Sequence, residues 1–413
     1  MIYRGCFSAP LFFGFDHEIR GRHILRKIII LLAGIVLPSV VLAGFPEPEV
    51  VADHLIIPWA LAFAPDGRIF VTERPGTLRV INADGTLQTA PVIGPPDIDV
   101  LAQSESGLMG VEVDPDFSDN GYLYIYFTTR NPTRNNLVRL VESGGTATVD
   151  AVLLDGVPGS TVQHDGGRIK IGPDGKMYIT TGNANMCSTS SQFLDSLAGK
   201  ILRMNLDGSA PEDNPFYPDY PLIYSFGHRN PQGIAFDDSG QLYETEHGPT
   251  ADPGCGRVIP RSWYDEVNII YGGGNYGWPL CYGPYSSDGG PCDTTQFLNP
   301  LWWTEPTNSQ PPTGAAFYAL PGATNKSLLY GMMGTYDTNP EFYIHARQIH
   351  YLTFADDGVT IIDEGEIYHG LYGRIREVIV GPDGYLYFTT SNRDGRYGPG
   401  LPPDDDKIYR VHF

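Results

Sequence analysis

The stretch 225–249 carries more polar chemistry than any other part of this 413-residue chain. It reads SFGHRNPQGIAFDDSGQLYETEHGP, with Arg229 and Asn230 ahead of a turn and Gly248 and Pro249 closing it. An arginine beside an amide can hold a carboxylate or quinone oxygen through charge-assisted hydrogen bonds. The carbonyl oxygens of a Gly-Pro pair suit a hard cation such as calcium. The stretch therefore favours an anionic, metal-bound ligand, with cation and carbonyls at the two ends of one β unit.

A second candidate is His164, which opens HDGGR just ahead of a strand-like run. An imidazole titrates near neutral pH and is the commonest general base. The glycines that follow allow a ligand to approach the backbone closely. The residues alone leave two roles open for His164, a base or a loop histidine bonded to a carbonyl. In the same way, Arg229 could bind a ligand or a structural carboxylate, and Gly248-Pro249 could be an ordinary turn.

Two further arginines, Arg374 and Arg376, stand two residues apart in GRIREVIVGPDG. In an extended segment both side chains point to the same face. Like charges on one face repel unless an anion lies between them, and Glu377 points the other way. The pair therefore predicts an anionic ligand, and the alternative is an exposed edge with two solvated arginines.

These candidates lie around a repeated unit, a Pro-Asp-Gly or Asp-Ser-Gly turn followed by a run of alternating apolar residues. Such a pattern predicts a turn that leads into a strand. Clear copies begin at Ala64, Asp114, Gly172, Asp237 and Gly381, and a weaker copy occupies 325–330. Six copies without long helical patterns predict an all-β fold, a six-bladed β-propeller, with a β-sandwich or paired β domains as the alternative. Loops of several blades would then converge at one end of the channel.

Composition sets further limits. A net charge of −21 leaves no basic face of the kind that binds nucleic acid. Hydrophobic residues make up 41% of the chain, enough for a substantial core. Because no linker interrupts the composition, we predict one domain over 45–413. The Gly- and Pro-rich stretch 272–312 is interpreted as a long excursion between two blades.

Residues 1–44 are predicted to be a signal peptide or an N-terminal anchor. Basic residues precede the apolar run 28–44, and small residues near Ala43 suit a signal peptidase. We expect an exported protein that is periplasmic, extracellular or anchored at the outer side of the cytoplasmic membrane, with membrane contact only through an uncleaved leader. Four cysteines follow the leader, so disulfides are plausible. Cys281 and Cys292 are the preferred pair because they close a Gly/Pro/Ser-rich loop.

The motifs in their order resemble the soluble PQQ-dependent sugar dehydrogenases, the glucose/sorbosone and aldose sugar dehydrogenase family. The resemblance covers nearly all of the chain beyond the leader. Single motifs are weak, whereas the ordered series is specific. The series is PWALAFAPDGRIFVTERPGTLRVI, GLMGVEVDPDF, HDGGR, SLAGKILRMNLDGSAPEDNPF, GHRNPQG, TEHGP, DEVNII, GGGNYGWP, GRIREV and KIYRV.

The resemblance implies that pyrroloquinoline quinone (PQQ) and calcium are cofactors and that a sugar hemiacetal is oxidised to a lactone. It assigns His164 as the base and Arg229 as the residue that stabilises charge on a quinone oxygen. The remaining positions would contact PQQ (Glu105, Asn230, Arg374, Arg376), bind the calcium at PQQ through carbonyls (Gly248, Pro249) or bind a second, structural calcium (Glu266, Tyr276). The sugar, the electron acceptor and the oligomeric state stay open.

The chain departs from the family pattern at two places. Asn183, in TTGN, stands where many members carry an acid that can stabilise the protonated base. Tyr336 and Asp337, in GMMGTYDTN, occupy a region where some members place a lysine against PQQ. These departures leave open a non-catalytic propeller that binds a glycan or a protein. A calcium-dependent lactone hydrolase is a third possibility, but it would need several carboxylates or amides converging on the metal.

Overall fold

The computed structural model describes residues 45–185, 189–249, 264–304, 309–334, 346–395 and 406–413. The span Phe45–Phe413 forms one compact unit. The predicted leader lies outside the described residues, as do Cys187, Cys255, Tyr336 and Asp337. Within the described parts of the chain, no helix is both long and apolar enough to cross a membrane.

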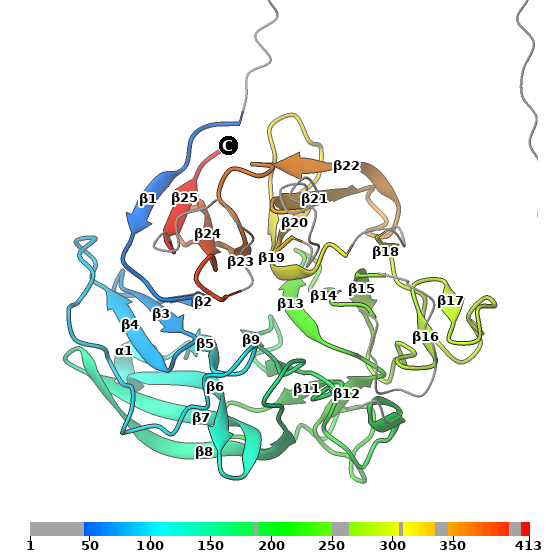
Figure 1. Ribbon diagram of the computed structural model, residues 1–413, viewed down its shortest axis with the longest axis horizontal. Helices are drawn as coiled ribbons and strands as arrows, with labels where there is room; N and C mark the ends of the chain where they lie inside the picture. The colour runs from blue at the N-terminus through cyan, green and yellow to red at the C-terminus, as the bar shows by residue number, and fades with distance from the viewer. Residues whose placement is uncertain (1–44, 186–188, 250–263, 305–308, 335–345, 396–405) are drawn as a thin grey trace, which may run out of the picture. The chain divides into compact units, whose positions relative to one another are not determined.

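Six antiparallel sheets stand around a central channel as the blades of a propeller (Figure 1). Blade one contains β2 (Pro58–Phe63), β3 (Ile69–Glu73) and β4 (Thr77–Ile81). Blade two contains β5 (Leu108–Val113), β6 (Tyr122–Arg130), β7 (Thr133–Ser143) and β8 (Thr146–Pro158). Blade three contains β9 (Gly166–Ile171), β10 (Met177–Thr181), β11 (Lys200–Met204) and β12 (Ile223–Phe226). Blade four contains β13 (Pro231–Phe236), β14 (Leu242–Glu246), β15 (Glu266–Ile270) and β18 (Trp302–Trp303). Blade five contains β19 (Pro312–Tyr318), β20 (Ser327–Met332), β21 (Ile349–Phe354) and β22 (Ile361–Ile367). Blade six contains β23 (Ile375–Val380), β24 (Leu386–Thr390), β25 (Ile408–Val411) and β1 (Glu49–Ala52). Two short helices, α1 (Phe117–Asn120) and the 3₁₀ helix η1 (Thr189–Gln192), lie in loops.

The ring is closed by the two ends of the folded unit. β1 pairs antiparallel with β25, with Glu49 opposite Arg410, so the first strand completes the last blade. The innermost strands contact one another in the order β2, β5, β9, β13, β19, β23 and back to β2. The predicted six-bladed β-propeller is therefore confirmed.

The repeated unit supplies the second strand of every blade, namely β3, β6, β10, β14, β20 and β24. The copy at Gly172 shows why the motif recurs, since Gly175 N–H donates to the Gly172 carbonyl at 2.9 Å. The Asp174 carboxylate accepts the N–H of Lys176 at 3.1 Å and fixes the turn ahead of β10. The weak copy at 325–330 is also such a strand, β20.

Most of the stretch 272–312, up to β18 (Trp302–Trp303), lies within blade four, and only its end leads to blade five, so its interpretation as an excursion between blades was wrong for that larger part. It leaves after β15, forms a small hairpin of β16 (Cys281–Tyr282) and β17 (Tyr285–Ser286), and returns as β18. Two-residue β18 pairs with Glu266 and Val267 and covers the outer edge of the blade. The predicted disulfide between Cys281 and Cys292 is confirmed.

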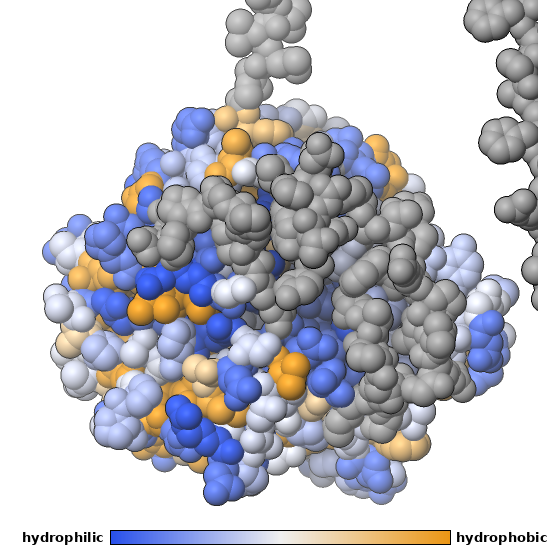
Figure 2. All heavy atoms as spheres, in the orientation of Figure 1, coloured by the Kyte–Doolittle hydropathy of each residue, from blue (hydrophilic) through white to orange (hydrophobic). Residues whose placement is uncertain are grey.

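Apolar side chains fill the space between neighbouring blades. Leu108, Ile125 and Leu137 of blade two are fully buried and belong to the largest apolar cluster, which extends into blades one and three. On the face drawn in Figure 2, hydrophilic residues are interspersed with small hydrophobic patches. This rigid packing fixes the strand ends on which the polar residues of the site stand.

Candidate functional site

The predicted pocket residues lie at strand ends that share one end of the channel. Glu105, His164, Asn230 and Arg374 come shortly before the first strands β5, β9, β13 and β23, whereas Asn183 and Gly248 follow the second strands β10 and β14. First and second strands of a blade run antiparallel, so the start of one adjoins the end of the other. The propeller therefore brings residues from four blades to one site, as the fold predicts.

His164 is buried, and its backbone φ is +70°, a conformation that residues other than glycine rarely adopt. Its backbone carbonyl packs so closely on Gly182 that a Cβ at residue 182 would lie 2.0 Å from that oxygen. Strained backbone of this kind is typical of functional sites.

The imidazole of His164 is oriented by Asn183. Nδ1 lies 2.8 Å from the Asn183 Oδ1. The same oxygen accepts the N–H of Asn185 at 3.1 Å, which identifies it as the acceptor side of the amide. Nδ1 therefore carries the hydrogen, and the lone pair of the neutral ring resides on Nε2.

Glu105 links the loops of blades three and four. Its Oε2 accepts the backbone N–H of His164 at 2.9 Å and the Asn230 Nδ2 at 3.4 Å. The Asn230 Oδ1 in turn accepts the N–H of Gly166 at 3.1 Å. The predicted polar pocket residue at position 105 is thus a carboxylate that connects the candidate base with the candidate amide.

Arg229 is almost completely buried, and no other described cation combines that burial with its size. Its Nη1 donates to the carbonyl of His247 at 3.1 Å, and its guanidinium lies 5.3 Å from the Trp278 ring centre. The backbone N–H groups of Arg229 and Asn230 both donate to Oε1 of Glu246, the last residue of β14. Both candidates are therefore held through their backbone as well as their side chains.

His247 completes this side of the pocket as a neutral ring. Its Nε2 lies 2.9 Å from the carbonyl of Pro312 and so donates, whereas Nδ1 accepts from the Asn230 Nδ2 at 3.3 Å. Burial, more than the neighbouring charges, lowers the pKa of His247 to about 3. His247 therefore orients Asn230 without adding charge.

Gly248 and Pro249 lie on the same side of the blade as Arg229, rather than at the opposite end of a β unit. The reason is that 225–249 holds two antiparallel strands, with Pro231 opposite Glu246. A Cβ at Gly248 would lie 1.6 Å from the Tyr264 carbonyl oxygen, so only glycine fits there. Gly248 N–H donates to Asp265 at 2.9 Å, and within the described chain no donor contacts the carbonyl oxygens of Gly248 and Pro249.

Arg374 and Arg376 are both buried at the start of β23, but the anion between them belongs to the protein. The Asp394 Oδ2 lies 2.9 Å from an Arg374 nitrogen and 3.8 Å from an Arg376 nitrogen. Like-charge repulsion therefore does not by itself require a ligand anion there, and the predicted anionic ligand stays a prediction. Burial, opposed by Asp394 and assisted by Arg374, lowers the pKa of Arg376 to about 9, so the side chain stays charged at neutral pH.

Arg74, Gln232 and Asp394 also belong to this set, and motif reasoning missed them. Arg74 follows β3 and lies near enough to Arg376 to lower its pKa. The Gln232 Oε1 accepts from Arg376 at 3.2 Å. Arg74 was identifiable by the rule that a residue just after a repeat strand faces the site, whereas Gln232 points inward from within β13 and carries no such signal.

Glu266 and Tyr276, predicted to bind a second calcium, lie in blade four beside the Arg229 loop. Glu266 begins β15 opposite Glu246, and its carboxylate accepts from Gly283 N–H and from the Asn268 Nδ2 at 3.4 Å. The Tyr276 hydroxyl donates to the Ile269 carbonyl at 2.7 Å. Burial, and then the charge of Glu246, raises the pKa of Glu266 to about 8. The ligand role of these residues stays a prediction.

Residues 55–399 match the family model for glucose / sorbosone dehydrogenase. The chain is 35% identical over 314 residues to quinoprotein glucose dehydrogenase B of Acinetobacter calcoaceticus. The matched region is 65% of this chain and 62% of that protein, so the chain spans less than two thirds of that relative's length. It is 32% identical over 368 residues to aldose sugar dehydrogenase YliI of Escherichia coli, covering 84% and 90% of the two chains. The PQQ-bound aldose sugar dehydrogenase of Streptomyces coelicolor has a similar structure, with a TM-score of 0.70, 30% identity and coverage of 88% and 96%.

Proposed function

The chain belongs to the glucose/sorbosone dehydrogenase family, and we propose that it binds PQQ with calcium at the polar end of the propeller and oxidises an aldose to its lactone. The observation that carries this proposal is the collection of buried cations around one opening. Arg229, Arg374 and Arg376 are each at most 5% exposed. Buried guanidinium groups are retained where they meet an anion.

The donor set fits a quinone that carries carboxylates. Four arginines, Arg74, Arg229, Arg374 and Arg376, lie among the carboxylates Glu105, Glu246, Asp265 and Asp394. The Arg376 Nε is buried and has no hydrogen-bond partner among the described residues. Buried arginines with an unused buried donor favour an anionic ligand. Arg374 and Arg376 would hold carboxylates, and Arg229 with Asn230 would hold the polar edge of the quinone.

Calcium is supported by the carbonyl oxygens of Gly248 and Pro249, whose turn is fixed from both sides. Asp265 accepts the Gly248 N–H at 2.9 Å, and it also accepts the Gln310 N–H at 2.6 Å and the Ser309 hydroxyl at 3.1 Å. Both oxygens of this carboxylate thus accept donors and stabilise the loop. Carbonyl oxygens are ordinary calcium ligands, and the cofactor and water would supply the remainder.

The proton of the substrate hydroxyl would be taken by Nε2 of His164. Asn183 fixes the tautomer by accepting the Nδ1 hydrogen, and Glu105 fixes the loop by accepting the His164 N–H. The chemistry that a bound PQQ supplies is acceptance of hydride from the sugar carbon. The buried guanidinium of Arg229 would stabilise the negative charge that develops on the oxygen beside it. Asn183 orients the imidazolium but adds no charge to it.

We further propose that the protein is exported, that residues 1–44 form the leader and that 45–413 form the single catalytic domain. The disulfide between Cys281 and Cys292 supports an oxidising compartment. The electron acceptor and the particular aldose depend on loops and are left to experiment.

The proposed function is tested with purified apoprotein, PQQ, calcium, a panel of aldoses and a redox dye. We expect PQQ to be retained after desalting and the dye to be reduced only when PQQ and an aldose are both present. Retention of PQQ without turnover of any aldose would favour the non-catalytic propeller. Neither retention nor turnover would overturn the proposal.

A further inference from the structure

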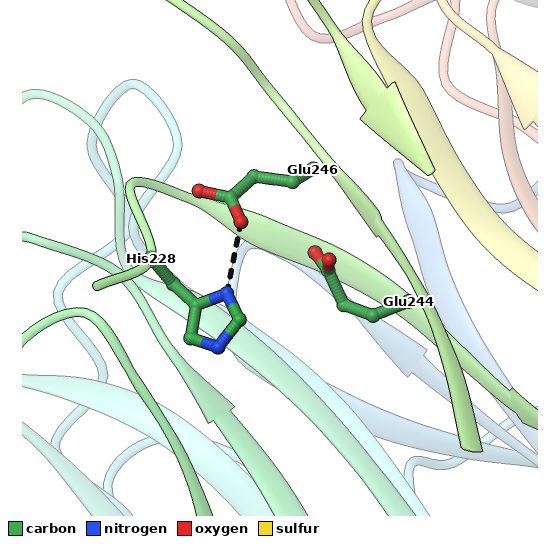
Figure 3. A group of neighbouring side chains, drawn as sticks. All are labelled: His228, Glu244 and Glu246. Carbon is green, nitrogen blue, oxygen red and sulfur yellow. Dashed lines mark hydrogen bonds and ion pairs between the residues drawn. The ribbon is translucent and has the colours of Figure 1, made fainter. Parts of the chain in front are cut away.

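Behind the Arg229–Asn230 loop, blade four buries a second polar cluster formed by His228, Glu244 and Glu246 (Figure 3). One imidazole nitrogen and one oxygen of each carboxylate all lie within 4.8 Å of one another, and all three side chains are buried. In Figure 3 the carboxylate of Glu244 lies on the same side of the strand as the His228 ring and Glu246. The cluster has no place in the proposed reaction.

The sheet register explains why acidic groups gather here. Glu244 stands opposite Asn268 and Glu246 opposite Glu266, so these four residues share one face of β14 and β15. Three carboxylates on one buried face repel one another, and each loses its hydration. Burial, and next the charge of Glu246, raises the pKa of Glu244 well above its ordinary value. The cluster therefore needs a proton or a cation.

Glu244 has an oxygen that the protein leaves unused. Its Oε2 accepts from the Asn268 Nδ2 at 3.0 Å, whereas its Oε1 has no hydrogen-bond partner among the described residues. Glu244 is 0% exposed, so water from the surface does not solvate that oxygen. Both oxygens of the neighbouring Glu266 accept donors, from Gly283 and Asn268. A buried, unsatisfied carboxylate oxygen in a cluster that also holds an imidazole and a second carboxylate indicates a site with one component to be added.

His228 is held in the orientation that a metal ligand needs. Its Nε2 lies 2.8 Å from the hydroxyl of Ser225, and its Nδ1 lies 3.0 Å from the Glu246 Oε2. Tyr276 stacks on the ring with centroids 4.6 Å apart. If Nε2–H donates to Ser225, the lone pair of Nδ1 faces the carboxylate, and both atoms can bind one ion. Atoms bound to the same ion at about 2.0–2.2 Å lie roughly 3.0 Å apart in octahedral and about 3.5 Å apart in tetrahedral geometry.

We propose that His228, Glu244 and Glu246 bind one divalent metal ion of the class that accepts a nitrogen ligand, Zn²⁺ or Mn²⁺. Calcium prefers oxygen alone, whereas one imidazole with two carboxylates is a typical set for zinc and manganese. Ser225 acts behind the metal by fixing the histidine tautomer. The site is separate from the Gly248-Pro249 carbonyls and does not depend on the proposed oxidation of a sugar.

The ion would also stabilise the cofactor pocket from behind. Glu246 Oε2 faces the cluster, while its Oε1 accepts the backbone N–H groups of Arg229 and Asn230. A metal on Oε2 would fix the carboxylate and, through it, the loop that presents both residues. Glu246 is therefore a positioning residue, with the metal as its support.

The test uses chelated apoprotein without PQQ, titrated with Zn²⁺ and with Mn²⁺ in excess Ca²⁺, which occupies oxygen-only sites. We expect one Zn²⁺ or Mn²⁺ per chain and a higher Tm on binding. Glu244→Gln, which keeps size and removes charge, should weaken binding by about 100-fold and abolish the Tm rise. Glu112→Gln, the same change at a half-buried glutamate in β5 of blade two, should bind as the wild type does.

X-ray absorption of the zinc-loaded protein supplies a second readout that needs no variant, and an imidazole nitrogen is expected among the nearest ligands. The proposal is overturned if neither ion binds the wild type, if Glu244→Gln binds as tightly, or if the bound zinc has oxygen ligands alone. Binding of calcium only would also overturn it. Loss of PQQ retention with intact zinc binding would contradict the proposed function and leave the metal site standing.

Discussion

In blade three an amide orients the ring of the candidate base, whereas in blade six a carboxylate pairs with the guanidinium of Arg374. The backbone N–H groups of His164 and Arg229 are both bound by carboxylates, Glu105 and Glu246. His164 is oriented by an amide, Asn183, at 2.8 Å. Arg229 is held through Glu246, and Arg374 through Asp394 at 2.9 Å. The two sides of one pocket thus use different electrostatics to orient their side chains.

The difference indicates how the two tasks are separated. A proton acceptor changes its charge during turnover, and an amide beside it fixes the tautomer without favouring the charged state. The arginines keep their charge throughout, and fixed carboxylates hold them in place before the ligand arrives. We therefore expect changes on blade three to alter the chemical step and changes on blade six to alter cofactor affinity.

The largest expected effect is that of His164→Ala. It should lower kcat by about 10²- to 10⁴-fold, the usual contribution of a general base, and leave PQQ affinity within a few-fold. Steady-state kinetics measure the effect on kcat, and equilibrium binding of PQQ measures the effect on cofactor affinity. A large loss of PQQ affinity with little loss of kcat would break the comparison, because His164 would then belong with the cofactor ligands.

Next in size is the pH dependence of stability caused by Asp165, which fastens the His164 loop. Burial, partly offset by the Ser160 N–H and the Ser106 hydroxyl, raises the pKa of Asp165 to about 6 from 3.8. The folded protein then binds the extra proton between pH 4 and 6, so its stability falls as pH rises through that window.

Relative to Asp165→Asn, the free energy of unfolding of the wild type should fall by about 2 kcal/mol from pH 4 to pH 7. Denaturant unfolding of both proteins at several pH values measures this difference. A difference that stays constant with pH would show that the loop is not fastened through a buried, protonated Asp165.

Arg376→Gln tests the charged side. Losing one charge-assisted contact of about 1.5–3 kcal/mol should raise the Kd for PQQ by roughly 10- to 100-fold, with kcat at saturating PQQ changed far less. Arg410→Gln is the matched control, because Arg410 pairs with Glu49 and Asp383 at the surface. Equal effects of both variants would remove Arg376 from the pocket.

The smallest expected effect is that of Asn183→Asp, which gives blade three a charged support. The carboxylate should stabilise protonated His164 and move the acidic limb of the kcat/KM profile up by about one pH unit. The value of kcat/KM at the pH optimum should change only a few-fold. An unmoved profile would show that residue 183 does not set the state of the base.

Much of the fold was predictable because its signal is local. Each turn and the alternating run after it lie within about a dozen residues, so even the weak copy that became β20 was found. β18, with two residues, carries no periodicity of its own. For that reason the excursion 272–312 was placed between blades, although most of it lies within one.

Site residues that flank a repeat strand were predictable from the sequence. Residues that act through a partner far away in the sequence were not. His164 and Arg229 stand in recognisable turns, but Asp394 becomes the partner of Arg374 only after the last blade folds. Glu244 and Glu246, two apart in ETEH, read as the solvent face of a strand. They are buried beside His228, whose ring stacks on Tyr276 of the excursion after β15, and no local pattern indicates that arrangement.

The most direct test of the central claim is the absorbance of the quinone in a single turnover. Protein loaded with PQQ and calcium is mixed with an aldose without any acceptor. The account predicts that the wild type reduces its bound quinone in one fast phase and that His164→Ala retains the quinone without reducing it. Reduction by His164→Ala at the wild-type rate, or a wild type that holds PQQ and reduces it with no aldose, would contradict the account.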